Sequence, residues 1–281
     1  MTKINSRTIP YLLYSLLPFK SLIPSSEPID IVIPIIEKDL KILPLCIDGV
    51  RNCVKNKINK IYIVAPKVED IIDFCRYNDL VFLHENSILG IEPKDINLII
   101  EGNNGERIDR SGWLFQQLLK LSGKIGDLDN YLCIDADHIL IHPHVFLTSD
   151  NIPVFYMSEE KHLPYYATIK KLLPISKFSS LSYVAHKMIF NKKTLGTMHK
   201  EIENISGNDW ITTIINNLDM QECSSFSEFE LYGNYTKIKI HRPWKQKTLK
   251  SSSYSLSYKS LCDNYQQRYA SLTFPDYLFD V

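Results

Sequence analysis

Two aspartates separated by one residue, Asp135 and Asp137, stand directly after the apolar run Tyr-Leu-Cys-Ile at 131–134. Such a run predicts a buried strand, and two carboxylates at its end are costly unless a positive charge binds there. A divalent cation chelated by nucleotide phosphates meets this need, because Mg²⁺ and Mn²⁺ take hard oxygen ligands. The pattern therefore predicts a metal-dependent nucleotide site. The alternative is a polar strand end that caps a helix.

The segments before this pair alternate between strands and helices. Strands are predicted at 29–36, 60–66 and 81–85, and helices at 39–54 and 68–77. Continuous apolar strands alternating with helices are typical of a parallel sheet covered by helices. Neither GxGxxG nor GxxxxGK[ST] follows any strand, which disfavours dinucleotide-binding dehydrogenases and P-loop NTPases. The expected fold class is thus α/β with a mostly parallel central sheet.

A helix is predicted over 111–122, after an expected loop at 86–110. One face of this helix is apolar, and the other carries four larger side chains spaced three and four residues apart: Trp113, Gln116, Gln117 and Lys120. That spacing places them on one side of the helix. Glutamine and lysine alone would indicate a solvent face, but the tryptophan favours a face that lines a cleft.

The second half of the chain continues the mixed pattern. Strands are expected at 154–160 and 182–190, and helices at 194–205 and 209–218. The segment 226–235 is left open between strand and helix. Residues 251–260 are rich in serine and expected to be irregular. The chain shows no repeat and no linker, so a single domain is expected.

Composition excludes several classes of protein. The chain has 281 residues, 32 basic and 32 acidic, and 44% of its residues are hydrophobic. That apolar content supports a large core and excludes a wholly disordered chain. A dedicated nucleic-acid binder would carry a basic excess, so no nucleic acid is expected as a partner. Six cysteines without a CxxC pair predict reduced thiols in a cytoplasmic protein.

Two segments bear on contact with a membrane. Residues 11–19 form an apolar run far shorter than the about 20 residues that span a bilayer, so a short packed helix is expected, with peripheral membrane contact as the alternative. The second segment, 237–250, has no acid and six basic residues: Lys237, Lys239, Arg242, Lys245, Lys247 and Lys250. It is either a solvated face or a surface that neutralises a diphosphate or attracts an anionic or lipid-diphosphate acceptor.

The succession IDIVIPII, KIYIVAP, VFLHE and YLCIDADHIL resembles the nucleotide-sugar half of GT-A glycosyltransferases. The resemblance covers roughly residues 29–245. The chain is also similar to a set of little-characterised bacterial proteins within that superfamily, in the segments RSGWLFQQLLKL, SYVAHKMIF and SEFELYGNY. This resemblance implies a GT-A-like, Rossmann-like fold that binds Mn²⁺ or Mg²⁺ at the Asp-x-Asp. It also implies a UDP-sugar or other nucleotide-sugar donor and a glycan or glycolipid acceptor. The expected location is cytoplasmic, with peripheral contact at the inner face of the membrane as the alternative.

The resemblance also implies a division of the chain. Residues 1–28 would be an N-terminal extension, 29–143 the nucleotide-sugar half and 144–250 the acceptor-side half, with 251–281 as a C-terminal tail.

By position, the resemblance assigns the metal and the diphosphate to Asp135 and Asp137, with Ala136 beside the donor. Many enzymes of this superfamily add a histidine from the C-terminal part of the domain, and His241 is the candidate here. A structural histidine is the alternative. His186, within an apolar run, is expected either as a core histidine or as a contact to a donor or acceptor sugar.

Donor contacts are implied for the loop after the first strand and for the helix before the Asp-x-Asp. The residues concerned are Pro34, Glu37, Asp39, Arg110, Trp113, Gln117 and Lys120. The loop departs from the commoner PxYNE form, and Asp39 is equally explained as a helix cap.

An inverting transfer needs a base that takes the proton of the acceptor hydroxyl. Glu228 is the expected base, with Glu230 and Asp209 as alternatives. Surface carboxylates without a catalytic role are the simpler interpretation, and a retaining mechanism would need no such base.

Three other classes compete with a transferase. A phosphatase of the haloacid-dehalogenase type also ends an apolar strand in Asp-x-Asp, but its motif stands near the N-terminus and a Gly-Thr turn follows it. Here His138 and Ile139 follow the motif. A non-catalytic nucleotide-sugar-binding protein would keep the site without the reaction. A nucleotidyltransferase would often carry a glycine-rich N-terminal loop, which this chain lacks.

Overall fold

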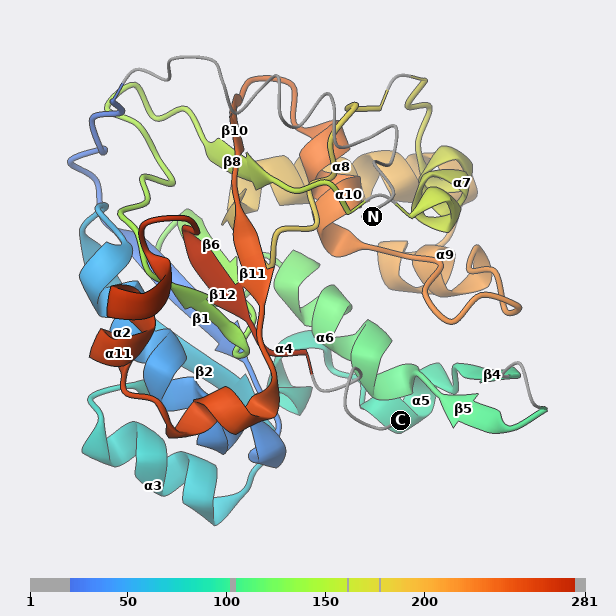
Figure 1. Ribbon diagram of the computed structural model, residues 1–281. Helices are drawn as coiled ribbons and strands as arrows, with labels where there is room; N and C mark the ends of the chain where they lie inside the picture. Colours follow the sequence, from blue (N-terminus) through green and yellow to red (C-terminus); the bar gives the residue numbers. More distant parts are fainter. Residues whose placement is uncertain (1–20, 102–104, 161, 177, 276–281) are drawn as a thin grey trace, which may run out of the picture.

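The apolar segments of the first half of the chain form the parallel strands of one sheet. The computed structural model describes residues 21–101, 105–160, 162–176 and 178–275. Its parallel strands are β1 (Ile29–Pro34), β2 (Ile58–Ala65), β3 (Val81–His84) and β6 (Asn130–Ile134). A fifth strand, β9 (Lys187–Asn191), runs antiparallel to β6, and the order is β3-β2-β1-β6-β9 (Figure 1). The predicted α/β fold with a mostly parallel central sheet is confirmed.

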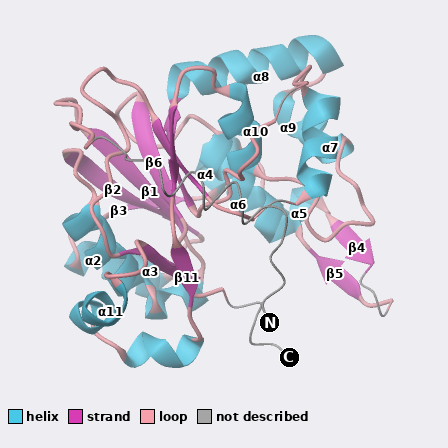
Figure 2. Cartoon of the chain, turned by 45° about the horizontal axis from the view of Figure 1, so that its top comes forward, coloured by secondary structure: helices cyan, strands magenta, loops and turns pink. Residues whose placement is uncertain are grey.

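Helices cover both faces of this sheet, as continuous burial of β1 requires. The connections between the strands contain α2 (Leu43–Cys53), α3 (Glu69–Tyr77) and α6 (Ser111–Leu121). Figures 1 and 2 show α2 and α3 on one side of the sheet and α6 on the other. The helix predicted at 39–54 is split into a 3₁₀ turn, η1 (Glu37–Lys41), and α2, because Pro44 in the first turn of α2 favours a helix start there.

The region predicted as a loop at 86–110 contains four short elements, so that prediction was largely wrong. They are α4 (Asn86–Leu89), α5 (Pro93–Ile96), and the antiparallel pair β4 (Ile99–Glu101) and β5 (Arg107–Asp109). Single buried side chains such as Ile88, Ile96 and Ile100 anchor them. One apolar anchor per element leaves no periodicity to detect.

The second half adds a helical layer and one more strand pair. Its elements are β8 (Val154–Met157), α7 (Leu163–Leu172), α8 (Lys192–Ser206), α9 (Trp210–Asn216), α10 (Glu228–Tyr235) and β10 (Ile240–Pro243). The helix α7 was not predicted, and both predicted strands are shorter than expected. The segment 226–235, for which the sequence did not decide between strand and helix, contains the helix α10. The Ser227 side chain caps this helix by accepting a hydrogen bond from the Glu230 amide.

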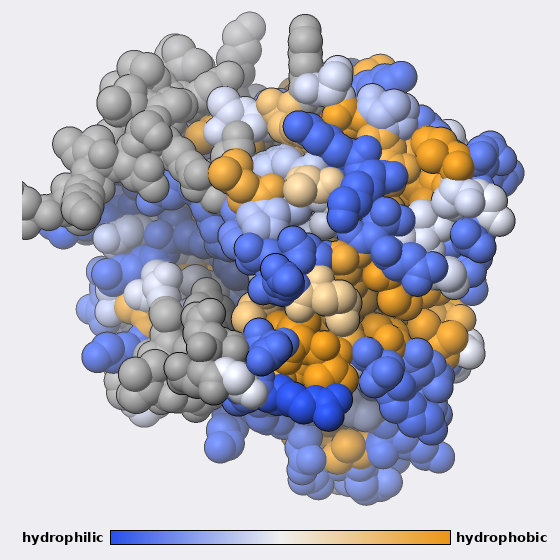
Figure 3. Space-filling view, turned by 90° about the vertical axis from the view of Figure 1, so that its right-hand side faces the viewer, coloured by the Kyte–Doolittle hydropathy of each residue, from blue (hydrophilic) through white to orange (hydrophobic). Residues whose placement is uncertain are grey.

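The outer side of this helical layer presents both apolar and polar side chains. Figure 3 shows the side of the molecule that lies at the right of Figure 1, with apolar surface set among polar side chains. Leu163, the first residue of α7, is 64% exposed. Apolar atoms make up much of the surface of any folded protein, so this mixture by itself assigns no function to that side.

The C-terminal part returns to the Asp-x-Asp. A small sheet of order β11-β12-β7 joins β7 (His138–Leu140), β11 (Gln246–Thr248) and β12 (Ser271–Thr273). The segment predicted to be irregular instead contains a 3₁₀ turn, η2 (Ser251–Ser255), and the start of α11 (Tyr258–Tyr265). Just past β12, the Phe274 amide donates to the Asp137 carbonyl at 3.0 Å. The tail therefore packs on the loop that carries the acidic pair.

The structure describes all six cysteines of the chain. All six are free thiols, and four of them are buried. The apolar run at 11–19 lies outside the part of the chain that the structure describes. Within that part, no helix combines the length and the apolar character needed to cross a bilayer.

Glu85 is a buried acid at the same sheet edge as the Asp-x-Asp. It follows β3, its amide donates to the Ala65 carbonyl at 3.0 Å, and its side chain does not cap α4. Its exposed fraction is 8%, and burial raises its pKa to about 7. Because the folded state holds this proton more tightly than the unfolded state, Glu85 favours folding below its ordinary pKa and loses that effect as the pH rises.

We predict that Glu85→Gln weakens the pH dependence of stability. In the wild type, the free energy of unfolding should fall between pH 4.5 and about 7, by about 2 kcal/mol after allowance for solvent screening. Urea unfolding followed by circular dichroism across this range should show a smaller fall in the variant. An identical fall in both proteins would show that Glu85 is not the group concerned.

Candidate functional site

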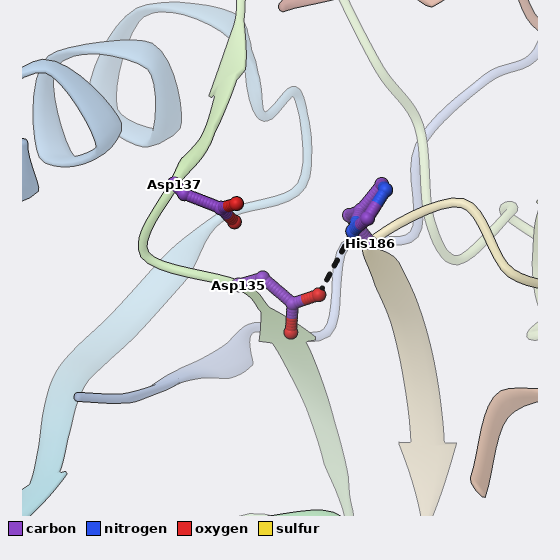
Figure 4. Close-up of side chains that lie close together, drawn as sticks. All are labelled: Asp135, Asp137 and His186. Atoms are coloured by element: carbon purple, nitrogen blue, oxygen red, sulfur yellow. Dashed lines mark hydrogen bonds and ion pairs between the residues drawn. The ribbon is translucent and has the colours of Figure 1, made fainter. Parts of the chain in front are cut away.

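Asp135, Asp137 and His186 come together where β6 ends and β9 begins. Their candidate ligand atoms all lie within 4.8 Å of one another. Asp135 directly follows β6 and His186 directly precedes β9; because these strands are antiparallel neighbours, the two residues are adjacent, and the Asp135 amide donates to the His186 carbonyl at 3.0 Å. Figure 4 shows the two carboxylates and the imidazole turned toward one space. Sheet register therefore builds this cluster.

His186 holds a backbone conformation that favours glycine. Its φ is 57°, in the left-handed region, where a non-glycine residue is under strain of about 1–3 kcal/mol. This turn interrupts the strand predicted at 182–190 and directs the imidazole to the acids. The His186 Nδ1 lies 3.1 Å from the Asp135 Oδ2. Strain of this kind at a charged cluster is typical of functional sites.

A buried cation connects the first aspartate to a third acid. The Lys120 Nζ donates to the Asp135 Oδ1 at 2.6 Å and to the Glu228 Oε1 at 2.7 Å. The Lys120 and Glu228 side chains are 8% and 5% exposed, compared with 24% for Asp135. α6 supplies the lysine and α10 supplies the glutamate. On the same face of α6, the Gln117 Oε1 accepts from the Glu228 amide at 3.1 Å.

The two aspartates have opposite electrostatic surroundings. Burial opposes ionisation of Asp135, but the charge of Lys120 and the hydrogen bond from His186 outweigh it and hold its pKa below the ordinary value. Among the described residues, the Asp137 carboxylate has neither an ion pair nor a side-chain hydrogen bond. Burial, together with the charge of Asp135, raises the pKa of Asp137 to about 6, although His186 opposes this rise. Negative charge at Asp137 is thus compensated only in part, by the charges of His186 and Lys120 and without a direct ion pair.

The cluster offers the ligand types of a divalent cation. Two carboxylates and one imidazole suit Mn²⁺, and the carboxylates also suit Mg²⁺. Burial alone would lower the pKa of His186, but its hydrogen bond with Asp135 and the charges of both aspartates raise it. A proton on this imidazole therefore offsets part of the negative charge, and a cation would compete with that proton.

The expected third ligand, His241, lies in a different contact. It stands on β10, and its Nε2 is 3.0 Å from the Tyr183 hydroxyl. The histidine that the structure brings to the acids is His186, for which the sequence predicted a core position or a sugar contact. The antiparallel pairing of β6 with β9 brings His186 next to Asp135, and local periodicity in the sequence does not predict which strands pair.

The loop after β1 holds the expected donor contacts Pro34, Glu37 and Asp39. Pro34 ends β1, and Glu37 is exposed in η1. The Asp39 Oδ2 accepts from the Ile36 amide at 2.9 Å, so this carboxylate caps η1. Its charge is nevertheless among those that raise the pKa of Asp137, which places this loop beside the acidic pair. Ala136, between the aspartates, is buried.

Arg110 and Trp113 form a stacked pair at the start of α6. The Arg110 guanidinium lies 4.3 Å from the centre of the Trp113 ring, and its Nε donates to the Cys223 carbonyl at 3.1 Å. The expected cleft-lining face of α6 is therefore divided. Trp113 is half-buried and stacked, whereas Gln117 and Lys120 are buried.

The three candidate bases differ in their surroundings. The Glu230 carboxylate accepts hydrogen bonds from Tyr166, Ser182, the Tyr183 amide and Asn234. Asp209 is exposed and caps α9 by accepting from the Thr212 amide at 3.0 Å. Only Glu228 of the three shares the network of Asp135.

Two residues beneath the cluster were not predicted from the sequence. Lys187 and His138 are buried, and the Lys187 Nζ lies 2.9 Å from the His138 Nε2. Burial lowers the pKa of Lys187 to about 7. The His138 ring stacks against the His186 ring, with 5.4 Å between the ring centres. A lysine within an apolar strand was the available signal, because lysine is almost never fully buried without a partner.

The basic segment 237–250 is partly used in packing. The Lys239 Nζ donates to the Gly233 carbonyl at 2.6 Å, near the C-terminal end of α10. The Lys247 Nζ lies over the Tyr269 ring, 5.4 Å from its centre. Both lysines therefore contact protein groups and do not form a solvated surface alone.

The chain is similar to known proteins at the level of a family and of solved structures. Residues 26–261 match a family described as "Family of unknown function (DUF6492)". No curated protein sequence matches the chain. Similar solved structures include mouse xyloside xylosyltransferase 1 in its apo form, with 7% identity, 91% of this chain and 100% of that chain covered, and a TM-score of 0.49.

Two further similar structures are those of LgtC and GlyE. An active-site mutant of LgtC, which is described as a galactosyltransferase, has 12% identity over 88% of this chain and 87% of that chain, with a TM-score of 0.44. The glycosyltransferase GlyE of Streptococcus pneumoniae TIGR4 has 10% identity, covers 88% of this chain and 54% of that chain, and has a TM-score of 0.41.

We predict that Lys120→Met destabilises the fold by about 3 kcal/mol, because it leaves one buried carboxylate and one partly buried carboxylate without their cation. Adding Glu228→Gln should restore part of the loss by removing one of those charges. Urea unfolding at pH 7.5 measures both variants, with exposed Lys124→Met as the matched control. Strictly additive losses in the double variant would contradict the coupling.

Proposed function

The chain belongs to the DUF6492 family, and we propose that it is a metal-dependent glycosyltransferase. It would move a sugar from a nucleotide-diphosphate donor, UDP-linked by the resemblance of its sequence, to a hydroxyl of a glycan or glycolipid. The observation that carries this proposal is the Asp135, Asp137 and His186 cluster at the carboxyl edge of the parallel strands. In open α/β sheets, ligands bind outside this edge.

Three features of the cluster support a cation held together with phosphates. The ligand atoms lie within 4.8 Å of one another, and the charge of Asp137 is offset only in part by His186 and Lys120. Asp135 and His186 keep 24% and 18% of their side-chain surface exposed. A bound divalent cation would act as a Lewis acid that stabilises the diphosphate leaving group.

The residues of the chain would divide the remaining work. Lys120 keeps Asp135 ionised and fixes the Oδ1 of its carboxylate. His186, strained at its backbone, holds the Oδ2 of the same carboxylate. We propose that the loop at 34–39 contacts the nucleoside and that the Arg110–Trp113 pair borders the sugar or the phosphates. In the transfer itself, the bond from the anomeric carbon to the diphosphate oxygen breaks and its electron pair leaves with the nucleoside diphosphate. A bond to the acceptor oxygen forms, and the proton of the acceptor hydroxyl passes to a base or to the departing diphosphate.

The phosphatase alternative is less well supported by this geometry. Its mechanism would use an aspartate of the motif as a nucleophile, yet both oxygens of Asp135 are held, one by Lys120 and one by His186. Within the described residues, the group gathered with the pair contains a histidine and no further acid. Sustained phosphate release from p-nitrophenyl phosphate would nevertheless overturn the transferase proposal.

We predict that Asp137→Ala abolishes Mn²⁺-dependent nucleotide binding, because it removes the carboxylate that has no direct ion-pair partner in the described protein. Isothermal titration calorimetry with UDP, GDP and CDP, each with and without Mn²⁺, should show wild-type binding only when the metal is present. The variant should lose at least about a hundredfold in affinity, and exposed Asp150→Ala should bind like the wild type. Equal affinity in Asp137→Ala and the wild type would contradict the site assignment.

A further inference from the structure

Glu228 is placed behind the candidate site and not on its open side. Its side chain is 5% exposed, compared with 24% for Asp135 and 18% for His186. A base must come within about 2.6–3.2 Å of the hydroxyl that it deprotonates, so it needs a surface that the acceptor can reach. The partly exposed groups of this network are Asp135 and His186, and the glutamate is covered.

The carboxylate of Glu228 is already engaged. Its Oε1 accepts from the Lys120 Nζ at 2.7 Å, inside a buried ion pair. The Lys120 ammonium also lies 4.7 Å from the centre of the Phe229 ring, which is the residue after Glu228 on α10. The amide of Glu228 is bound to the Gln117 side chain. Contacts at both its backbone and its side chain therefore fix the glutamate against α6.

We propose that Glu228 is a positioning residue that acts through Lys120 on Asp135. This rests on the proposed function, and it replaces the expectation that Glu228 is the base. Glu228 accepts one N–H of the Lys120 ammonium. This orients the ammonium so that another N–H donates to the Asp135 Oδ1, with the Lys120 Nζ at 2.6 Å from that oxygen. An inverting transfer would then need a proton acceptor other than Glu228.

The charge balance explains why this arrangement would serve a metal. Lys120 is shared between two carboxylates, so it compensates Asp135 only in part. If Glu228 lost its charge, the whole of the Lys120 charge would act on Asp135, and that carboxylate would attract a cation less strongly. Residues that orient metal ligands through hydrogen bonds affect metal affinity by about 10–100-fold.

The test compares Mn²⁺ affinity in the wild type, Glu228→Gln and Glu228→Asp. Free Mn²⁺ is followed by electron paramagnetic resonance in the presence of UDP, and circular dichroism reports the fold of each variant. We expect Glu228→Gln to weaken Mn²⁺ binding by about 10–100-fold. Glu228→Asp, which keeps the charge, should recover part of that loss. Glu222→Gln, at a side chain that is 43% exposed, should bind Mn²⁺ as tightly as the wild type.

The outcomes separate this proposal from the one on which it rests. No Mn²⁺ binding by the wild type would overturn the proposed function itself. Wild-type binding with unchanged affinity in a folded Glu228→Gln would overturn the positioning role alone. If Glu228→Gln does not fold, Glu228→Asp decides: reduced affinity supports positioning, and unchanged affinity contradicts it.

Discussion

One buried lysine between two carboxylates is the interaction on which the site depends. Lys120 comes from α6, Asp135 from the end of β6 and Glu228 from the start of α10, and the two ion pairs measure 2.6 and 2.7 Å. Each charge alone would be expensive to bury, so each of the three side chains is stabilised by the others. The two ion pairs of Lys120 thereby connect the central sheet to the helices α6 and α10. Orientation of the Asp-x-Asp is a consequence of how α6 and α10 pack.

The two aspartates of the motif are unequal for this reason. Asp135 is compensated by Lys120 and His186, whereas Asp137 retains a charge that no described residue pairs. A rigid ligand beside a partly compensated one is a suitable arrangement for reversible cation binding, because the geometry is preformed and the charge compensation is incomplete. The positive φ of His186 adds a local cost at the same place. Contacts of the surrounding fold offset that cost, and they include the hydrogen bond from the C-terminal part of the chain to the Asp137 backbone.

Features that depend on residues close together in the chain could be predicted from the sequence, and contacts between distant segments could not. The parallel strands and the acidic pair were predicted, because continuous apolar runs and the residues that end them are local features. The presence of His186 beside the acids, in place of His241, was not, since it depends on the pairing of β6 with β9. The ion pair of Glu228 with Lys120 was not predicted for the same reason, because the two residues stand 108 positions apart in the chain, and Glu228 was instead expected to be the base. The short elements at 86–110 contain too few apolar side chains in register for periodicity to reveal them.

We propose that Asp135, Asp137 and His186 together hold a divalent cation. Pulsed electron paramagnetic resonance of Mn²⁺ bound with UDP tests it directly, because an imidazole ligand couples its nitrogen to the electron spin. We expect nitrogen coupling in the wild type and its loss in His186→Asn, with Mn²⁺ still bound through the carboxylates. A wild-type spectrum without nitrogen coupling, or one identical to that of hydrated Mn²⁺ in solution, would contradict the claim.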